Sequence, residues 1–478
     1  MIPEKKTLLV LLSLFAGISL SLLWISTNHS GIARAEELDA YSTYYVALSG
    51  SCGGRTPCYT TIQAAVDAVD SSSDLIKVAA GTYTTINTKG GKSQIVYINK
   101  TLTLRGGYTS SNWNTSNPTG NPTILNAQGN GRGIYVTGDI NPTVDGFRIT
   151  GGDATGLGGY DYYGTYNVGG GVYVVTATAT LVNNQIYTNI AQHGGGVFMI
   201  QSSGTLRNNT ISENNVTSGG GGLGVYKGSP VIDNNTIISN TSTNLGGGVY
   251  LFSTNAILTK NKVTGNTAAT LAGGIDVASC SPSFNGNLIT GNTADKGGGL
   301  YLWYSYSVFT NNVITDNKSK SQGSGLYIGG SQPRLLHTTI ARNSGGGGIG
   351  VYVTSDGMTE YSTVAMTNTL LISHTVGIKI TVSNTLTLNG VLWYSTPTTI
   401  SQVSAIVSVQ NQYTGNPSFN TDGYHIKSTS AAINKGVPAG IYTDIDGQPR
   451  TSTTSDLGAD EYWPSGTPKY VYLPIIVR

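Results

Sequence analysis

The chain has 478 residues, a formal net charge of +2 and only 10% charged residues, and glycine occupies 65 positions. This balanced charge excludes the basic face that nucleic-acid binding requires. The 29 tyrosines and the many β-branched residues between the glycines exclude a disordered chain and favour short strands separated by tight turns.

The N-terminus has the pattern of an export signal. Lys5 and Lys6 precede the apolar run TLLVLLSLFAGISLSLLWI, and the small-x-small sequence ARA follows at 33–35. We therefore predict a signal peptide over 1–35 and a secreted or cell-surface protein. Because an apolar run of about 20 residues can also span a bilayer, an uncleaved N-terminal anchor is the alternative and the one membrane contact that we expect.

Two of the three cysteines are close in sequence. Cys52 and Cys58 lie in SCGGRTPC and can form a disulfide in an oxidising compartment. Half a metal site is the other interpretation, but no second Cys or His pair with zinc spacing accompanies them. We therefore expect a disulfide, no metal and no cofactor, and we expect Cys280 to be a small buried residue.

A short segment with helical spacing follows, and then a long repeat. The sequence TIQAAVDAV at 61–69 has the apolar spacing of a short helix. Over 184–343, segments of the form Asn/Thr-x-aliphatic-x-x-Asn recur every 25 or 26 residues, each followed by a glycine cluster and an apolar-aromatic stretch such as GGGVY. This period is too short for a strand-helix-strand unit, and it suits three strands and three turns, one coil of a parallel β-solenoid.

In such a solenoid, equivalent positions of successive coils form columns. Stacked asparagine amides can then hydrogen-bond along the axis and also bond to the backbone of the turns. We predict one asparagine column at Asn184, Asn209, Asn235, Asn261, Asn287 and Asn312, and a second at Asn189, Asn214, Asn240, Asn266, Asn292, Asn317 and Asn343. The aliphatic residues between the two columns are predicted to form the core.

The repeat resembles the right-handed parallel β-helix family, which has the pectin-lyase-like fold, over about residues 55–400. The resemblance implies an all-β, single-stranded right-handed parallel β-helix with rungs of ~25 residues, in which 61–69 is a short N-terminal capping helix. The sequences DIDGQPR, from Asp444, and DLGADEY, from Asp456, resemble the ending of secreted bacterial β-helix proteins. The predicted domains are the signal peptide (1–35), an N-terminal cap and first rungs (36–150), the regular array (151–400), C-terminal rungs and cap (401–465) and a tail (466–478).

Within GGGVYV, side chains alternate between the two faces of a strand. One column is aliphatic, and the other is aromatic except at Asp276. Because an unpaired carboxylate is costly inside a core, we predict that the aliphatic column points inward and the other outward. The outward residues, which we call the aromatic stripe, are one column of Tyr173, Phe198, Tyr226, Tyr250, Asp276, Tyr301, Tyr327 and Tyr352, with Phe252 and Trp303 two residues further along their strands on the same face. The inward column contains Val225 between Val197 and Val249.

The stripe has two interpretations. Stacked rings on a sheet stabilise it by roughly 0.5–1.5 kcal/mol per pair without any ligand. A long exposed apolar strip can also be a platform for sugar rings, which predicts an adhesin-like, monomeric protein that binds a polysaccharide or cell-surface glycan. A purely structural surface protein is a further possibility.

Catalysis on the same face is the enzymatic alternative. Glycoside hydrolysis usually needs two carboxyls about 5–10 Å apart. The stripe carries only Asp276, with Asp295 as a candidate neighbour, and the chain lacks the acid cluster that the resemblance would require of a polysaccharide lyase. The sequence therefore favours binding over catalysis.

Overall fold

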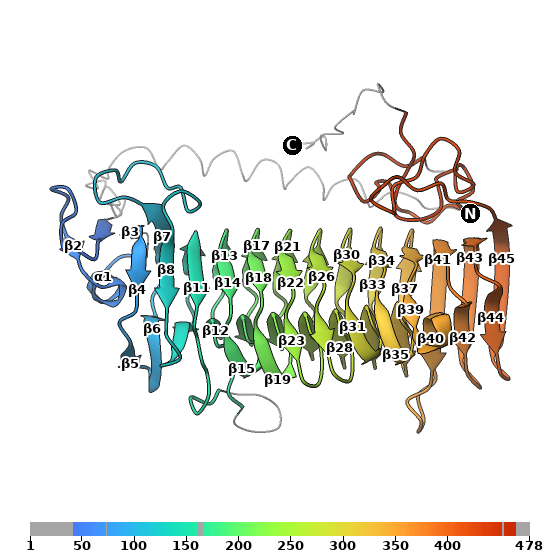
Figure 1. Ribbon diagram of the computed structural model, residues 1–478, viewed down its shortest axis with the longest axis horizontal. Coiled ribbons are helices and arrows are strands. Elements are labelled where there is room, and N and C mark those ends of the chain that lie inside the picture. Colours follow the sequence, from blue (N-terminus) through green and yellow to red (C-terminus); the bar gives the residue numbers. More distant parts are fainter. Residues whose placement is uncertain (1–41, 73, 160–165, 452–453, 465–478) are drawn as a thin grey trace, which may run out of the picture. The chain divides into compact units, whose positions relative to one another are not determined.

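The computed structural model describes residues 42–72, 74–159, 166–451 and 454–464, which form a parallel β-solenoid of about twelve turns (Figure 1). Nearly all of its regular structure is β-strand, so the predicted all-β parallel β-helix is confirmed. The predicted signal peptide (1–35) and tail (466–478) lie outside the described residues, and the other domain limits stay predictions.

The strands form three sheets, which we number 1 to 3. Sheet 1 contains β1 (Thr43–Val46), β2 (Cys58–Tyr59), β3 (Leu75–Ala79), β4 (Gly81–Tyr83), β7 (Thr103–Tyr108), β8 (Thr123–Asn126), β10 (Thr143–Asp145), β11 (Phe147–Thr150), β13 (Thr180–Val182), β14 (Gln185–Tyr187), β17 (Thr205–Arg207), β18 (Thr210–Ser212), β21 (Val231–Asp233), β22 (Thr236–Ile238), β25 (Ile257–Thr259), β26 (Lys262–Thr264), β29 (Ser283–Asn285), β30 (Leu288–Thr290), β33 (Val308–Thr310), β34 (Val313–Thr315), β37 (Arg334–Leu336), β38 (Thr339–Ala341), β41 (Thr363–Ile372), β43 (Thr385–Tyr394) and β45 (Ile406–Thr414). Sheet 2 contains β5 (Asn87–Lys89), β6 (Lys92–Ile98), β9 (Arg132–Thr137), β12 (Val172–Val175), β16 (Val197–Ile200), β20 (Leu223–Tyr226), β24 (Val249–Phe252), β28 (Ile275–Ala278), β32 (Leu300–Trp303), β36 (Leu326–Gly329), β40 (Ile349–Thr354), β42 (Val376–Ile380) and β44 (Thr398–Gln402). Sheet 3 contains β15 (Ile190–His193), β19 (Asn215–Gly219), β23 (Thr241–Ser242), β27 (Thr267–Ala268), β31 (Thr293–Lys296), β35 (Lys318–Gln322) and β39 (Ser344–Gly345).

Each regular rung contributes one strand to sheet 2, two to sheet 1 and one to sheet 3, and the strands pair in parallel with those of the next rung. The register places like residues above one another, for example Ile186, Ile211 and Ile237. These side chains are fully buried and share one continuous core with the inward column of sheet 2. The predicted inward direction of the aliphatic residues is therefore correct.

Both predicted asparagine columns are continuous hydrogen-bonded ladders. Asn214 shows the pattern: its backbone N–H and its Nδ2 both donate to Asn240 Oδ1, at 3.0 and 2.9 Å. The same Nδ2 also donates to the carbonyl oxygen of Ile186, at 3.0 Å. Since the ladder asparagines are buried, these bonds satisfy polar groups that would otherwise be costly.

The turns of a regular rung use left-handed backbone at four points. Two are the residues before the ladder asparagines, as at Asn208 (φ 56°), and a third follows the strand of sheet 2, as at Gln201 (φ 49°), so these corners accept residues other than glycine. The fourth is the corner in the glycine cluster, as at Gly194 (φ 58°). The later glycines are needed for space, because a Cβ on Gly196 would lie 2.6 Å from the carbonyl oxygen of Gly222.

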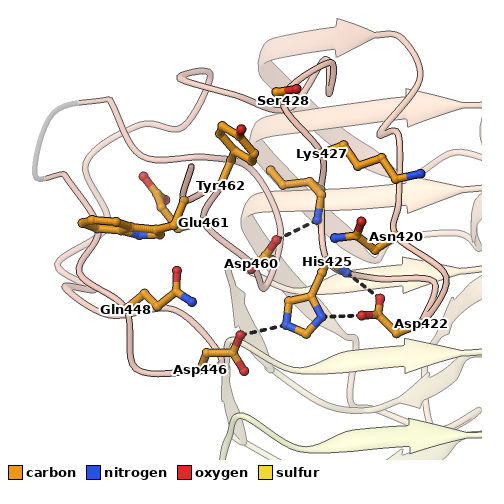
Figure 2. A pocket seen from close by; sticks show the side chains of 12 residues that line it. Asn420, Asp422, His425, Lys427, Ser428, Asp446, Gln448, Asp460, Glu461 and Tyr462 are labelled. Carbon is orange, nitrogen blue, oxygen red and sulfur yellow. Dashed lines mark hydrogen bonds and ion pairs between the residues drawn. The ribbon is translucent and has the colours of Figure 1, made fainter. Parts of the chain in front are cut away.

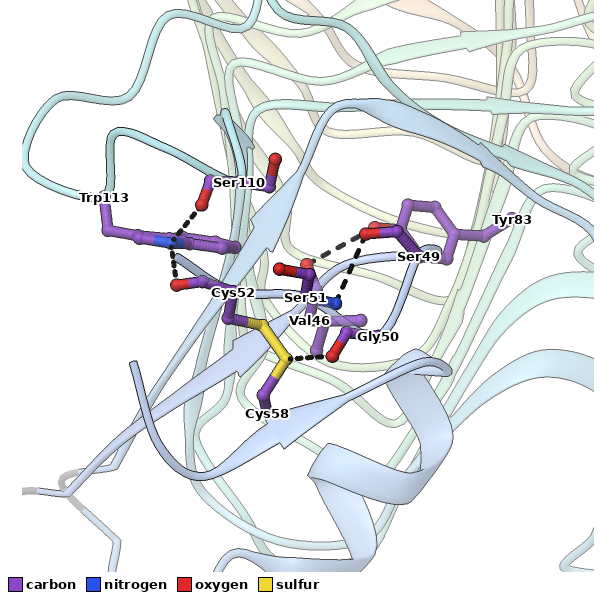
Figure 3. The surroundings of a disulfide bond; sticks show 9 residues. All are labelled: Val46, Ser49, Gly50, Ser51, Cys52, Cys58, Tyr83, Ser110 and Trp113. Atoms are coloured by element: carbon purple, nitrogen blue, oxygen red, sulfur yellow. Dashed lines mark hydrogen bonds between the residues drawn. A yellow bond between two sulfur atoms is a disulfide. The ribbon is translucent and has the colours of Figure 1, made fainter. Parts of the chain in front are cut away.

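The N-terminal end is covered by α1 (Ile62–Ala68), as predicted for a capping helix. Thr61 Oγ1 accepts a hydrogen bond from the Ala64 N–H at 3.3 Å, and Ile62, Ala65 and Val66 pack onto the solenoid core. Nearby, Cys52 and Cys58 form a disulfide, with the Trp113 indole N–H donating to the Cys52 carbonyl (Figure 3). None of the helices in the described residues is long and apolar enough to span a membrane. Among the described residues, the single-turn η1 (Gly346–Gly348) is the other helical element.

Residues 415–464, which we call the C-terminal segment, follow β45 and contain no named helix or strand where the structure describes them. They pack on the outer side of sheet 1 near β38, β41 and β43 (Figure 1). Ile426 and Leu457 contribute to a small apolar cluster there, and the Ala459 N–H donates to Thr339 Oγ1 at 3.0 Å.

Candidate functional site

The outer face of sheet 2 carries the aromatic stripe as two columns, two residues apart along each strand. The first column runs Tyr97, Tyr135, Tyr173, Phe198, Gly224, Tyr250, Asp276, Tyr301, Tyr327, Tyr352 and Lys379. The second contains Ile200, Tyr226, Phe252, Ala278, Trp303 and Gly329.

The predicted position of Tyr226 is wrong by one column. Gly224 is the residue that pairs with Phe198 and Tyr250, and Tyr226 pairs with Phe252. The shift is two residues, so Tyr226 still points outward, and in the same way Leu223 rather than Val225 pairs with Val197 and Val249. The Phe198 ring lies over Gly224, where a Cβ would be 2.6 Å from Cδ2 of the ring.

The prediction that the stripe is an exposed platform is wrong for most of its length. Seven of its side chains are buried: Tyr173, Phe198, Tyr226, Asp276, Tyr301, Tyr327 and Tyr352. Tyr250, Phe252 and Trp303 are half-buried. The outward-facing rings are thus mainly a second apolar layer, separate from the solenoid core.

A column from sheet 3 and its turns covers the buried rings. It runs His193, Gly219, Leu245, Leu271, Lys296 and Gln322, immediately before the glycine corner of each rung. The His193 ring lies 5.7 Å from the Tyr250 ring, and Leu271 packs on the cluster that contains Tyr301. Burial lowers the pKa of His193 to about 4, which suits a neutral corner histidine.

The rings stack along the solenoid axis in two groups. Tyr301, Tyr327 and Tyr352 have successive centroid distances of 4.8 and 5.2 Å. On the other side, the Tyr226 and Phe252 rings stack at 5.6 Å. Such contacts stabilise the sheet in the way that the structural interpretation requires.

Asp276 and Ala278 separate the two groups, between the half-buried Phe252 and Trp303. Asp276 is 2% exposed, and its carboxyl makes no hydrogen bond or ion pair within the described ranges. Burial raises its pKa to about 8, so the carboxyl is largely protonated at neutral pH. A buried, unpaired acid in an otherwise aromatic column costs stability, which is typical of a functional residue.

Asp295 does not form a catalytic pair with Asp276 through any contact that the structure shows. It lies in β31 of sheet 3, part-exposed, and its carboxyl makes no hydrogen bond or ion pair among residues 42–464 as far as they are described. Its backbone N–H and carbonyl bond to neighbouring rungs. The geometry therefore supports Asp276 alone as a chemically unusual group on this face.

Three lysines lie over rings of the stripe. Lys227, Lys296 and Lys379 hold Nζ at 5.1, 5.7 and 5.9 Å from the ring centroids of Tyr226, Tyr327 and Tyr352. All three are part-exposed. Their ammonium groups place three positive charges beside the stripe.

A second candidate site lies in the C-terminal segment, where the sequence predicted only a closing motif. The buried Arg450 guanidinium donates to the carbonyl oxygens of Gly458 and Ala459, at 2.9 and 2.6 Å, and pairs with Glu461 at 2.9 Å. Asp444 accepts from the backbone N–H groups of Asp446 and Gln448. The motif residues thus hold a chain without regular structure in one shape.

Beside this network, His425 lies between two carboxylates (Figure 2). Its Nδ1 is 2.7 Å from Asp422 and its Nε2 is 2.8 Å from Asp446. These partners raise the pKa of His425 to about 9, while burial raises that of Asp460 to about 7. No single sequence motif marks this group, since its members come from separate loops.

Comparison with known proteins supports the fold. The model of the family described as "Right handed beta helix region" matches residues 132–312 and 272–393, which together are more than half of the chain. No curated protein matches the sequence.

Two solved structures are similar in shape. One is titled "Crystal structure of pectate lyase Pel9A", at 14% identity and a TM-score of 0.47, covering 88% of this chain and 97% of that one. The other is titled "The complex structure of XylC with xylose", at 10% identity and a TM-score of 0.49, covering 87% and 98%. At these identities and scores, neither carries an argument about activity.

Proposed function

Because the chain belongs to the right-handed β-helix family, whose stacked rungs repeat one outer face along the solenoid, we propose that this face binds a polysaccharide or cell-surface glycan. The protein is then an exported, adhesin-like binding protein. Export is supported by the signal-like sequence of 1–35, and the disulfide between Cys52 and Cys58 suits an oxidising compartment.

The observation that carries the proposal is the interruption of the stripe at Asp276 and Ala278. The two adjacent rungs fill the first column with the rings of Tyr250 and Tyr301, and such rings stabilise the sheet. This rung instead holds a small residue and an unpaired acid, and it lies between Phe252 and Trp303, where ring surface is still accessible. Those rings are the contacts for sugar C–H faces, and the buried Asp276 lies between them.

Charge favours an acidic glycan over a neutral one. Lys227, Lys296 and Lys379 lie over the stripe, and Asp276 is largely uncharged at neutral pH. Carboxylate or sulfate groups of a glycan would pair with the lysines. Such part-exposed charge pairs are screened by salt, so binding is expected to weaken as ionic strength rises.

Trp303→Ala and Phe252→Ala are expected to weaken retention of an acidic polysaccharide such as polygalacturonate by about tenfold each, since each removes a half-buried ring from the contact. Affinity electrophoresis in gels that contain the polysaccharide measures the retention. Neutral xylan in a parallel gel is expected to retain the wild type less.

The matched control is Tyr306→Ala, which removes an exposed tyrosine outside the two columns. It is expected to migrate like the wild type in every gel. Binding at the stripe is rejected if neither polysaccharide retains the wild type, or if all three variants are retained as strongly as the wild type. A purely structural surface role is then left.

A second candidate, a polysaccharide lyase or glycoside hydrolase on the same face, is favoured by one observation. A carboxyl with a pKa of about 8 is protonated at neutral pH and can serve as a general acid. If this is its role, polysaccharide incubated with the wild type will accumulate reducing or unsaturated ends, and Asp276→Asn will lower that rate by at least about a hundredfold. If the variant still forms product at the wild-type rate, Asp276 takes no part in the chemistry. If the wild type forms no product, the enzymatic function is rejected and only binding is left as a function of this face.

A further inference from the structure

The C-terminal segment contains a cavity of about 460 Å³ that the aromatic stripe does not share. Figure 2 shows it between three stretches of the segment, with lining residues that include Asn420, His425, Gln448, Asp460 and Tyr462. Its volume lies within the range of about 300–1,000 Å³ that is usual for small-molecule sites.

Hydrogen bonds to the backbone hold the lining residues in place. The Asp460 carboxylate accepts the N–H of Ile426 at 2.7 Å. Asp422 Oδ1 accepts the N–H groups of Tyr424 and His425, at 3.0 and 3.1 Å. The cavity is thus preorganised without a helix or strand at its wall.

The charges around the cavity are mixed in sign. His425 is positive at neutral pH and lies between the carboxylates of Asp422 and Asp446. Lys427 also lines the cavity, and Glu461 pairs with Arg450. With positive and negative groups both present and partly paired, a neutral, hydroxyl-rich ligand fits better than a strongly charged one.

Two buried polar atoms at this cavity have no hydrogen-bond partner within the described residues. One is the Gln448 Oε1 acceptor and the other is the Trp463 Nε1–H donor, and both residues line the cavity. Buried donors and acceptors in native proteins normally have partners, so this orphaned pair has the capacity to take a ligand's hydrogen bonds. A sugar hydroxyl can accept from one atom and donate to the other.

The same place offers ring surface. Tyr462 and Trp463 are half-buried residues of the lining, so part of each side chain stays accessible. Aromatic surface beside amide and carboxylate groups suits a sugar, which has apolar C–H faces and hydroxyl edges.

We propose that this cavity binds a neutral carbohydrate, with Gln448 and Trp463 bonding its hydroxyls and the aromatic rings packing on its C–H face. The site is separate from the stripe, and neither requires the other.

The test uses the full-length chain and four neutral probes, the methyl glycosides of glucose, galactose, mannose and xylose. Saturation-transfer difference NMR titrations are expected to show binding of at least one of them. Trp463→Phe, which keeps a ring but removes the donor, and Gln448→Leu, which removes the acceptor, are each expected to weaken that binding about tenfold. The double variant is expected to lose it.

The matched control shares the chemistry of the glutamine change at another place. Gln402→Leu alters an exposed glutamine of β44. It is expected to bind the glycosides like the wild type.

Asn420→Ala keeps the test decisive if a buried change disturbs folding. Asn420 is exposed at the cavity, and its side chain makes no hydrogen bond in the described structure, so its removal leaves the scaffold intact. It is expected to weaken binding about threefold. A wild type that binds none of the four glycosides, or a folded double variant whose affinity stays within twofold, would overturn the proposal and leave the orphaned atoms to water.

Discussion

Asn240→Ala is expected to destabilise the middle of the solenoid by at least about 4 kcal/mol, because four hydrogen bonds depend on one buried side chain. Asn240 Oδ1 accepts from the backbone N–H and the Nδ2 of Asn214, and its own Nδ2 donates to Asn266 and to the Ile211 carbonyl. Alanine leaves these partners buried and unpaired, and it also opens a void.

Guanidinium unfolding followed by circular dichroism measures the loss, and hydrogen exchange locates it in the rungs around 214–240. Asn215→Ala is the matched control, since Asn215 is an exposed strand residue without a side-chain hydrogen bond in the described structure. It is expected to change stability by less than about 0.5 kcal/mol. Equal stability and exchange in the two variants would mean that the ladder adds nothing beyond the strand pairing.

Asp276→Asn is expected to stabilise the protein by an amount that is small below about pH 4 and grows steadily up to about pH 8. The pKa of Asp276 is about 8 in the folded chain against a reference value of 3.8, so unfolding between these values releases a proton. Stability therefore falls as pH rises from about 4 to about 8, by up to about 1.4 kcal/mol per pH unit. Asparagine does not titrate and removes this slope.

Thermal unfolding of both proteins between pH 5 and pH 8 gives the comparison. Burial also raises the pKa values of Asp460 and Glu461 to about 7, so these residues make the stability of both proteins fall with rising pH. The difference in stability between the two proteins therefore isolates the contribution of Asp276. Asp295→Asn is the control, because it neutralises a part-exposed acid on the neighbouring sheet and should keep the wild-type profile. Parallel curves for Asp276→Asn and the wild type would contradict the assignment of a buried, protonated carboxyl.

The repeat made the fold predictable because identical residues at a constant spacing must stack. Asn214 and Asn240, 26 residues apart, were enough to imply a ladder, and their side chains hydrogen-bond as expected. The inward direction of the aliphatic column also followed from alternation along a strand.

The strand register of the rung that contains 218–226 was harder to predict, because its sequence can be aligned with the other rungs in two ways. In SGGGGLGVY, the sequence GVY matches other rungs by identity, whereas the structure aligns the glycine cluster and places Leu223 beside Val197. The backbone decides, since glycines such as Gly222 fit where a Cβ would lie 2.9 Å from a neighbouring carbonyl oxygen. Gly224 then occupies an aromatic position, and the Phe198 ring covers it.

Neither the burial of the stripe nor the existence of the second site could be predicted from the sequence. Alternation shows which face a ring occupies, but the cover over Tyr250 comes from His193, more than two rungs earlier in the chain. The cavity depends on loops without periodicity: Gln448 and Trp463 both line it, and Arg450 ties the two stretches together through its bonds to the Gly458 and Ala459 carbonyls.

The C-terminal segment also changes how the solenoid would respond to mechanical force. Elsewhere each rung pairs its strands with the rungs before and after it, so tension along the axis can peel rungs off singly. The segment instead lies across several rungs, with bonds to Asn311, Thr339 and Asn368 and apolar contact with Leu392. Shear must break these attachments together, so this end of the solenoid acts as a clamped block and the opposite end yields first.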